Sequence, residues 1–308
     1  MNKLTKISMT ALSTALIAGS VQAMDYSISG GASISYTGVN TTSDTNPWGM
    51  GDSITFSTSG ELDNGMTVSV SLEMDDHGSD AIDDKSIKID TGNGVVGFAS
   101  SVGGIGGIGT IANKVPNAFT PVFQATNAVD YGQADQKMSS AGQWGYKHTV
   151  GGVGISLGYT PGGNTNGGAD TGWSLSYADL IDGMEVGYGQ QDDGTTSEAE
   201  TAYVKYVTGG ITVAYQKSKV DYESTGTSDE DATHYGISLA VNDDLSVSVG
   251  RQDVEIGTSA SEEENTGVSA SYTMGSVKIG LGFNKAANVG GSAGVDNEAT
   301  AGSITFSF

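Results

Sequence analysis

Residues 67–74, TVSVSLEM, place an apolar residue at every even position and a polar residue at every odd one. Successive side chains of a β-strand point to opposite faces of the sheet, so an alternation of period two predicts a strand with one apolar and one polar face. The same alternation recurs in residues 53–59 (SITFSTS), 245–249 (LSVSV), 277–283 (VKIGLGF) and 303–308 (SITFSF). We therefore expect amphipathic strands along most of the chain.

The connections between the predicted strands alternate in length. Turns of two or three Gly, Asn, Asp or Ser residues, such as Gly151 and Gly152, alternate with polar loops of six or more residues. Short turns at one end and long loops at the other are typical of an antiparallel meander whose two ends face different surroundings. The sixteen predicted strands are residues 25–38, 52–62, 66–75, 84–91, 94–100, 140–150, 153–160, 171–181, 184–192, 199–208, 211–221, 232–241, 245–256, 265–274, 277–288 and 298–308.

Two architectures use many amphipathic strands: a soluble all-β fold with its apolar faces inside, and an outer-membrane barrel with its apolar face towards lipid. The polar face here is rich in Ser, Thr and Gly. A sixteen-stranded barrel is too wide for side chains to fill, so its lumen holds water, and closure removes the unpaired edges that a bilayer forbids. After Ala23 no run of 18 apolar residues could form a membrane-spanning helix. The pattern favours an all-β, 16-stranded antiparallel transmembrane β-barrel.

The first 23 residues have the composition of a targeting segment. Lys3 and Lys6 precede a moderately apolar stretch at residues 7–19, and small residues stand at Val21 and Ala23. This arrangement is typical of a cleaved secretory signal peptide. We therefore expect residues 1–23 to be removed on export and residues 24–308 to form a single barrel domain.

The charge and the absence of cysteine exclude several classes of protein. The 308 residues include 13 Lys+Arg and 36 Asp+Glu, a formal net charge of -23, and no Cys. Such a charge repels nucleic-acid phosphates. Without cysteine there is no disulfide framework, no cysteine zinc site and no thiol nucleophile.

With these features the chain resembles a Gram-negative general porin, similar to the sixteen-stranded porins of alphaproteobacteria. The closing segment 302–308 (GSITFSF) supports the resemblance, because it ends in Phe308 and has an apolar residue at every second position. In the family such a terminus resembles the signal read by the outer-membrane assembly machinery. The resemblance implies passive diffusion of small hydrophilic solutes and ions in the outer membrane of a Gram-negative bacterium. It also implies a homotrimer in contact with outer-membrane lipid and lipopolysaccharide.

The loop at residues 101–139 is much longer than the other loops, which have 6 to 13 residues. A structureless stretch of this length is usually functional or wrongly assigned. In porins the third loop folds into the barrel and narrows the pore, so the resemblance assigns 101–139 as a constriction loop. Alternatively, residues 101–139 form a loop on the protein surface whose charged side chains are solvated. The charged candidates in this loop are Lys114, Asp130, Asp135 and Lys137.

Alternation also predicts which charged residues point into the lumen. These candidate pore-wall residues are Glu61, Glu73, Asp75, Lys88, Asp90, Lys147, Glu185, Lys205 and Lys278. Because acidic residues outnumber basic ones over the chain, we expect a mild cation preference. Alternatively the wall charges pair across the lumen or are screened by salt. The only arginine, Arg251, shares the outward parity, so the arginine cluster of well-studied family members has no counterpart here.

Three more specific sequence features give little support for a nucleotide site, a catalytic site or a metal site. Residues 104–109 (GIGGIG) match a dinucleotide fingerprint, but Pro116 and Pro121 break the helix that such a site needs. The histidines His77, His148 and His234 lack metal-binding spacing, and no catalytic arrangement is apparent, so neither an enzyme nor a dedicated cofactor is expected. Acidic runs in the long loops could hold Ca²⁺ or Mg²⁺ loosely or simply be solvated. A substrate-selective channel and a non-transport surface or adhesin-type protein remain alternative functions.

Overall fold

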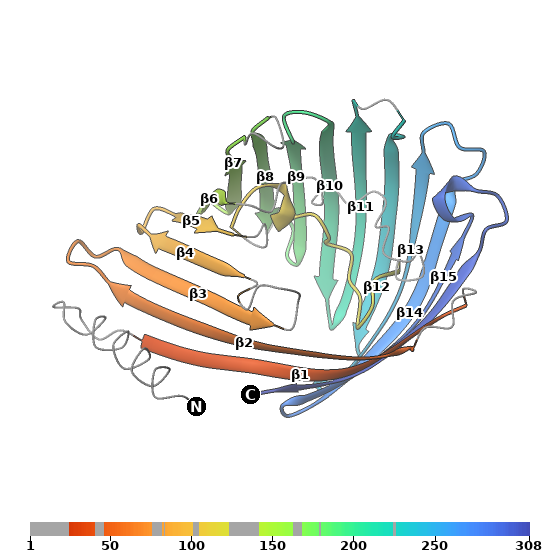
Figure 1. Cartoon of the computed structure of the whole chain (residues 1–308), viewed down its shortest axis with the longest axis horizontal. Helices are drawn as coiled ribbons and strands as arrows, with labels where there is room; N and C mark the ends of the chain where they lie inside the picture. Colours follow the sequence, from red (N-terminus) through yellow and green to blue (C-terminus); the bar gives the residue numbers. More distant parts are fainter. Residues whose placement is uncertain are drawn as a thin grey trace.

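The barrel is known from a computed structural model that describes residues 25–40, 46–75, 82, 84–100, 105–122, 142–162, 168–178, 180–223 and 226–308. Sixteen strands form one closed antiparallel sheet in which each strand pairs with its neighbours in the chain (Figure 1). The last strand pairs with the first, so the sheet has no free edge. The predicted fold class is confirmed.

The strands lie within a few residues of their predicted bounds. In the described part of the chain no helix is both long and apolar enough to cross a membrane. The elements are β1 Asp25–Val39, β2 Trp48–Glu61, β3 Thr67–Asp75, β4 Lys85–Asp90, β5 Val95–Ala99, η1 Ile108–Thr110, β6 Gln143–Val150, β7 Val153–Thr160, β8 Asp170–Ala178, β9 Met184–Asp192, β10 Ser197–Thr208, β11 Ile211–Tyr222, β12 Glu230–Ala240, β13 Leu245–Ile256, β14 Glu263–Met274, β15 Val277–Ala287, η4 Val289–Gly291 and β16 Asn297–Ser307.

The start of β2 is the clearest boundary error. The strand begins at Trp48, four residues before the predicted start at 52. Glycines at positions 49 and 51 hide the polar half of the alternation, yet both pair with inward serines of β1. Trp48 lies opposite Tyr36, and their rings make an edge contact at a centroid distance of 5.2 Å. Aromatic pairing on the outer face therefore extends β2 towards the long-loop end.

Two-residue glycine turns connect adjacent strands at one end of the barrel. In the turn between β6 and β7, Gly151 and Gly152 have φ angles of 57° and 81°. Two consecutive positive φ values match the twist of the flanking strands, and glycine adopts them without steric cost. This end, with its tight turns, contrasts with the long loops at the other end, as the sequence predicts.

The C-terminal residue completes the closure. The backbone of Phe308 exchanges two hydrogen bonds with Gly30, at 2.8 and 2.9 Å. A Cβ atom at Gly30 would come within 2.9 Å of the Phe308 ring, so the small residue makes room for the aromatic side chain. The apolar face thus continues across the β1–β16 junction.

The outer face is apolar and exposed. Ile28, Val268, Leu281 and Phe283 are each at least half exposed, although their register places them in strand interiors. Water-soluble monomers rarely show apolar patches larger than a few hundred Å². The inner face carries hydroxyl groups instead, such as the Ser57–Ser71 pair with their Oγ atoms 3.3 Å apart. The barrel is therefore built for hydrocarbon outside and water inside.

Candidate functional site

Residues 105–122 line the inside of the barrel. Figure 1 shows this yellow segment crossing the inner side of successive strands, and its described contacts reach every strand from β5 to β15. Eighteen extended residues span about 60 Å. Ten inter-strand steps of about 4.8 Å make an arc of about 50 Å. The segment therefore follows the wall in a nearly extended form.

The segment begins in close contact with β5–β8. Ile105 packs against Gly97 and Gly145, and the backbone of Gly106 lies on that of Leu157. The Thr110 hydroxyl lies 2.8 Å from the Ser174 hydroxyl, and Ser174 also donates to the Gly107 carbonyl at 3.1 Å. Gly106 thus allows close backbone approach, and the only helix at the motif is the three-residue η1, Ile108–Thr110.

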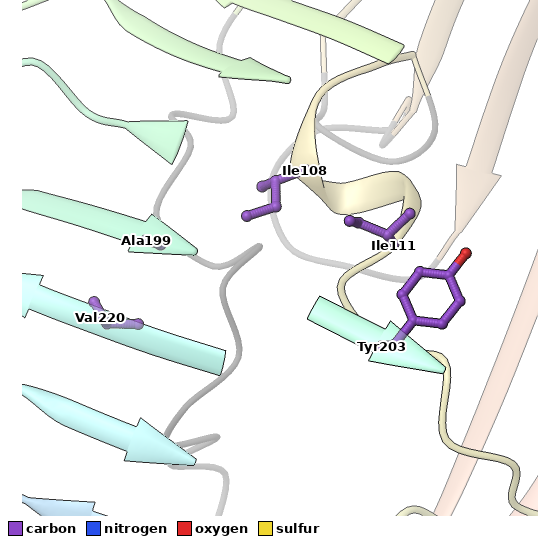
Figure 2. Packing of buried hydrophobic residues seen from close by; sticks show 5 residues of the cluster. All are labelled: Ile108, Ile111, Ala199, Tyr203 and Val220. Carbon is purple, nitrogen blue, oxygen red and sulfur yellow. The ribbon is translucent and has the colours of Figure 1, made fainter. Parts of the chain in front are cut away.

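Hydrophobic packing holds the next few residues. Figure 2 shows Ile108 on η1 and Ile111 directly after it, packed against Ala199, Tyr203 and Val220 of the wall. Ile108 and Val220 are fully buried. Fully burying one aliphatic side chain contributes about 1.5–3 kcal/mol. This apolar cluster within a polar lumen fixes the position of η1.

Side-chain amides and hydroxyls replace the missing backbone partners of the segment. The Gln216 amide donates to the carbonyls of Ile111 and Ala112 at 2.9 Å, and its oxygen accepts the Lys114 N–H at 2.8 Å. Further along, Ala118 and Phe119 N–H groups donate to Ser248 and Ser269 at 2.8 and 3.0 Å. Asn284 donates to the Pro121 carbonyl at 2.8 Å. A buried extended segment needs such partners, and sequence reasoning missed all of them.

Inward glycines form a track beneath the segment. If one of these glycines carried a Cβ atom, that atom would lie less than 3.0 Å from an atom of residues 105–122. Real Cβ atoms essentially never come so close to another residue, so a larger side chain would displace the segment. All of these glycines occupy inward-facing positions of their strands. Glycine at such positions was therefore a sequence signal for the segment, which the alternation alone did not reveal. The glycines are Gly97, Gly145, Gly236, Gly250, Gly280 and Gly282.

Lys114 is the only charged residue of the segment. Its ammonium lies 3.4 Å from a carboxylate oxygen of Glu185 and 5.4 Å from the ring centroid of Tyr203. Glu185 also pairs with Lys205 and accepts the Tyr203 hydroxyl. The structure thus brings together three predicted site residues, Lys114, Glu185 and Lys205, and adds Tyr203, which the sequence analysis did not select.

The remaining candidate wall residues lie on the inner face at different heights. Lys88, Asp90, Lys147 and Lys278 lie towards the short-turn end of their strands. The other candidates are Glu61 at the short-turn end and Glu73 and Asp75 at the long-loop end. The predicted loop residues Asp130, Asp135 and Lys137 lie outside the described residues.

Arg251 lies on the outer face. It pairs in register with Tyr235 and Thr266, and its guanidinium binds Asp253 at 2.6 Å and Glu264 at 3.0 Å. It therefore contributes no charge to the lumen. Among the described residues no group of three or more His, Asp or Glu side chains is arranged to hold a metal ion.

The comparisons with known proteins agree with this geometry. The model of the Gram-negative porin family matches residues 8–308. The chain belongs to the Gram-negative porin family. A mutant of Rhodopseudomonas blastica porin has a similar structure, with a TM-score of 0.67 and 14% identity over 92% of this chain and 100% of that one. OmpT of Vibrio cholerae has a TM-score of 0.68 and 13% identity over 93% and 98%. No curated protein matches the chain.

This porin is therefore an integral outer-membrane protein whose strands cross the bilayer. The exposed apolar face is its lipid-facing surface, and the hydroxyl-lined interior is its channel. Residues 105–122 lie inside that channel against its wall.

Proposed function

We propose that this porin lets small hydrophilic solutes and ions diffuse passively down their gradients, with residues 101–139 as the constriction loop. The observation that supports this is the path of residues 105–122, which lie on the inner wall from β5 to β15. A segment held there narrows the lumen, and its described contacts lie on β5–β15. The mechanism needs neither catalysis nor a resident cofactor.

We further propose a mild cation preference. Carboxylates lie near both mouths of the lumen: Glu73 and Asp75 towards the long loops, and Glu61 and Asp90 towards the short turns. Charges at the mouths of a wide, wet channel change the local ion concentration without binding ions tightly. Because the Debye length is about 8 Å at 0.15 M salt, the preference should weaken as the salt concentration rises.

Assembly and surroundings complete the proposal. A homotrimer is supported by the trimer form described for Vibrio cholerae OmpT, a protein of the same fold. Residues 1–23 act as a cleaved signal peptide, residues 24–308 form one barrel domain, and Phe308 serves as the terminus that the assembly machinery reads. The outer face contacts lipid and lipopolysaccharide.

Divalent cations would be held only loosely at the rim. Glu262, in the loop between β13 and β14, has a raised pKa because it is partly buried and because Asp253, Glu255 and Glu264 repel its negative charge. A transient Ca²⁺ or Mg²⁺ shared with lipopolysaccharide phosphates would relieve that repulsion.

Planar-bilayer recordings test the channel. The parent should form ohmic pores in KCl, with a reversal potential in a salt gradient that favours cations. Deleting residues 108–119 should raise the single-channel conductance, because the wall then loses its covering segment. Deleting residues 258–261 of the loop between β13 and β14 is the matched control and should leave the conductance unchanged. A parent that forms no pores would overturn the proposal and favour a non-transport surface protein.

A further inference from the structure

We propose that the inner face of β1–β4, near the short turns, binds the two charged ends of a zwitterionic solute of dipeptide size. This inference rests on the channel function proposed above and specifies one class of solute that the channel would retain briefly. Three features support it: a cavity on this wall, a carboxylate and an ammonium on opposite sides of the cavity, and serine hydroxyls between them.

The cavity on this wall has a volume of about 430 Å³. It borders the first four strands, which are neighbours in the sheet (red to orange in Figure 1). The described contacts of residues 105–122 lie on other strands, β5–β15. A volume of this size accommodates a small solute. The inward residues that line the cavity are Asp25, Ser27, Ser57, Ser59, Ser69, Ser71, Ser86 and Lys88.

The strand register places the two charged residues at the ends of one row. Asp25 on β1 pairs with Ser59 on β2. Ser69 on β3 pairs with both Ser59 and Lys88 of β4. Three inter-strand steps of about 4.8 Å therefore separate the Cα atoms of Asp25 and Lys88 by about 14 Å along the wall. A small solute can lie between the carboxylate and the ammonium and contact both.

Both charged groups are available to a ligand. Within the part of the chain that the structure describes, neither Asp25 nor Lys88 forms an ion pair or a side-chain hydrogen bond. Asp90, two residues further along β4, accepts the Gly92 N–H at 2.9 Å and does not pair with Lys88. Because the wall faces water, each contact with a solute charge would be modest, which suits brief retention in a channel.

Serine hydroxyls occupy the wall between and beside the two charges. The row next to Asp25 and Lys88 consists entirely of serine on these four strands, namely Ser27, Ser57, Ser71 and Ser86. The Oγ atoms of Ser57 and Ser71 lie 3.3 Å apart. A hydroxyl both donates and accepts hydrogen bonds, so this wall can bind the N–H and the carbonyl of a peptide bond.

A zwitterion fits this arrangement better than an ion of either sign. An anionic solute would be attracted by Lys88 and repelled by Asp25, and a cationic solute would meet the reverse. A solute with an ammonium at one end and a carboxylate at the other gains both attractions in one orientation. The row of opposite charges therefore selects for solutes that carry both groups.

Single-channel recordings of the full-length porin in a KCl background test the site. The probe is glycylglycine, and its matched analogues are N-acetylglycylglycine, which lacks the ammonium, and glycylglycinamide, which lacks the carboxylate. We expect glycylglycine to reduce the KCl current in a saturable manner. Its half-saturating concentration should be about threefold lower than that of either analogue, because each analogue loses one charged contact at a solvated site.

Two variants assign the ends of the solute. D25N should raise the half-saturating concentration of glycylglycine and of glycylglycinamide about threefold, without raising that of N-acetylglycylglycine. K88Q should raise the values for glycylglycine and N-acetylglycylglycine by a similar factor, without raising that of glycylglycinamide. This crossed pattern is not expected from a general change in the bore, which would affect all three probes alike.

The K278Q variant is the matched control. It removes one positive charge from the inner face of β15, where Lys278 pairs in register with Thr273 and Thr305, and should leave the half-saturating concentration of glycylglycine unchanged. Normal KCl conductance without saturation by glycylglycine would overturn the inference while leaving the channel function intact. Equal values for the three probes, or an equal shift in K88Q and K278Q, would overturn it as well. Absence of KCl conductance in the parent would instead refute the proposed function.

Discussion

The inner wall of the barrel consists of two unlike regions. On β5–β15, which we term the covered arc, residues 105–122 lie on glycines, amides and a few apolar side chains. We term β16 and β1–β4 the open arc, because none of the described contacts of residues 105–122 lie there. Its inner face consists mainly of Ser and Thr. Both regions have the same alternation and the same apolar outer face. They differ in their inward side chains and in what those side chains contact.

This difference has a simple physical cause. Hydroxyl groups suffice for a wall that meets water, because water satisfies both their donors and their acceptors. A wall that meets a nearly extended segment must supply partners for unpaired backbone groups, as Gln216 and Asn284 do, and must leave room, as the inward glycines do. The period of the alternation thus determines which face of the sheet a side chain occupies. The size and polarity of an inward side chain depend instead on whether it contacts water or residues 105–122.

The largest effect should come from charges on the outer face, and it should be the same in both arcs. Val70→Lys on β3 and Val268→Lys on β14 should each lower the free energy of unfolding by about 2–4 kcal/mol, because each places a lysine in hydrocarbon. Urea unfolding from lipid vesicles measures this loss. Ser69→Lys, one residue away on the inner face of the open arc, is the control and should change stability by about 0.5 kcal/mol or less. An equal loss in Ser69→Lys and Val70→Lys would contradict the assignment of faces.

A second prediction separates the arcs from the inside. Gly145→Ala on the covered arc would place a Cβ atom under 3.0 Å from the Ile105 backbone. We expect a cost of about 1–3 kcal/mol, or displacement of the start of the segment with a rise in single-channel conductance. In the open arc, Gly51→Ala would meet only the Ser33 hydroxyl at 3.2 Å. Conductance and unfolding should remain near the parent values in that variant, and matching effects in the two variants would remove the distinction between the arcs.

The barrel could be predicted from the sequence because its information is local. Each strand shows its alternation within eight or so residues, and the turns and the Phe308 terminus add independent signals. The error at the start of β2 arose where Gly49 and Gly51 replace the polar residues of the pattern.

The constriction could be predicted only in part, because its contacts are distant in sequence. Parity places Glu185 and Lys205 on the inner face, but nothing in the sequence pairs Lys114 with a carboxylate 71 positions away. Gln216 has the parity of any lumen residue, so its role as a backbone partner becomes apparent only once the path of the segment is known. Extended loops without periodicity carry no signal for the wall that they follow.

The smallest expected effect is at the rim of the covered arc, in the loop between β9 and β10. Partial burial of Asp193 opposes ionisation, but hydrogen bonds from Thr195, Thr196 and Ser197 outweigh it and lower the pKa of the carboxyl group. A lowered folded-state pKa means that the ionised form stabilises the loop above the unfolded-state value of about 3.9, and that this contribution disappears as the pH falls through the folded-state pKa. Asp193→Asn should therefore cost about 1 kcal/mol at pH 7, measured by thermal unfolding in detergent, with a smaller difference from the parent below pH 3. Asp182→Asn, in the short turn between β8 and β9, is the control. A deficit in Asp193→Asn that does not shrink in acid would show that the side chain acts through its shape and not through its charge.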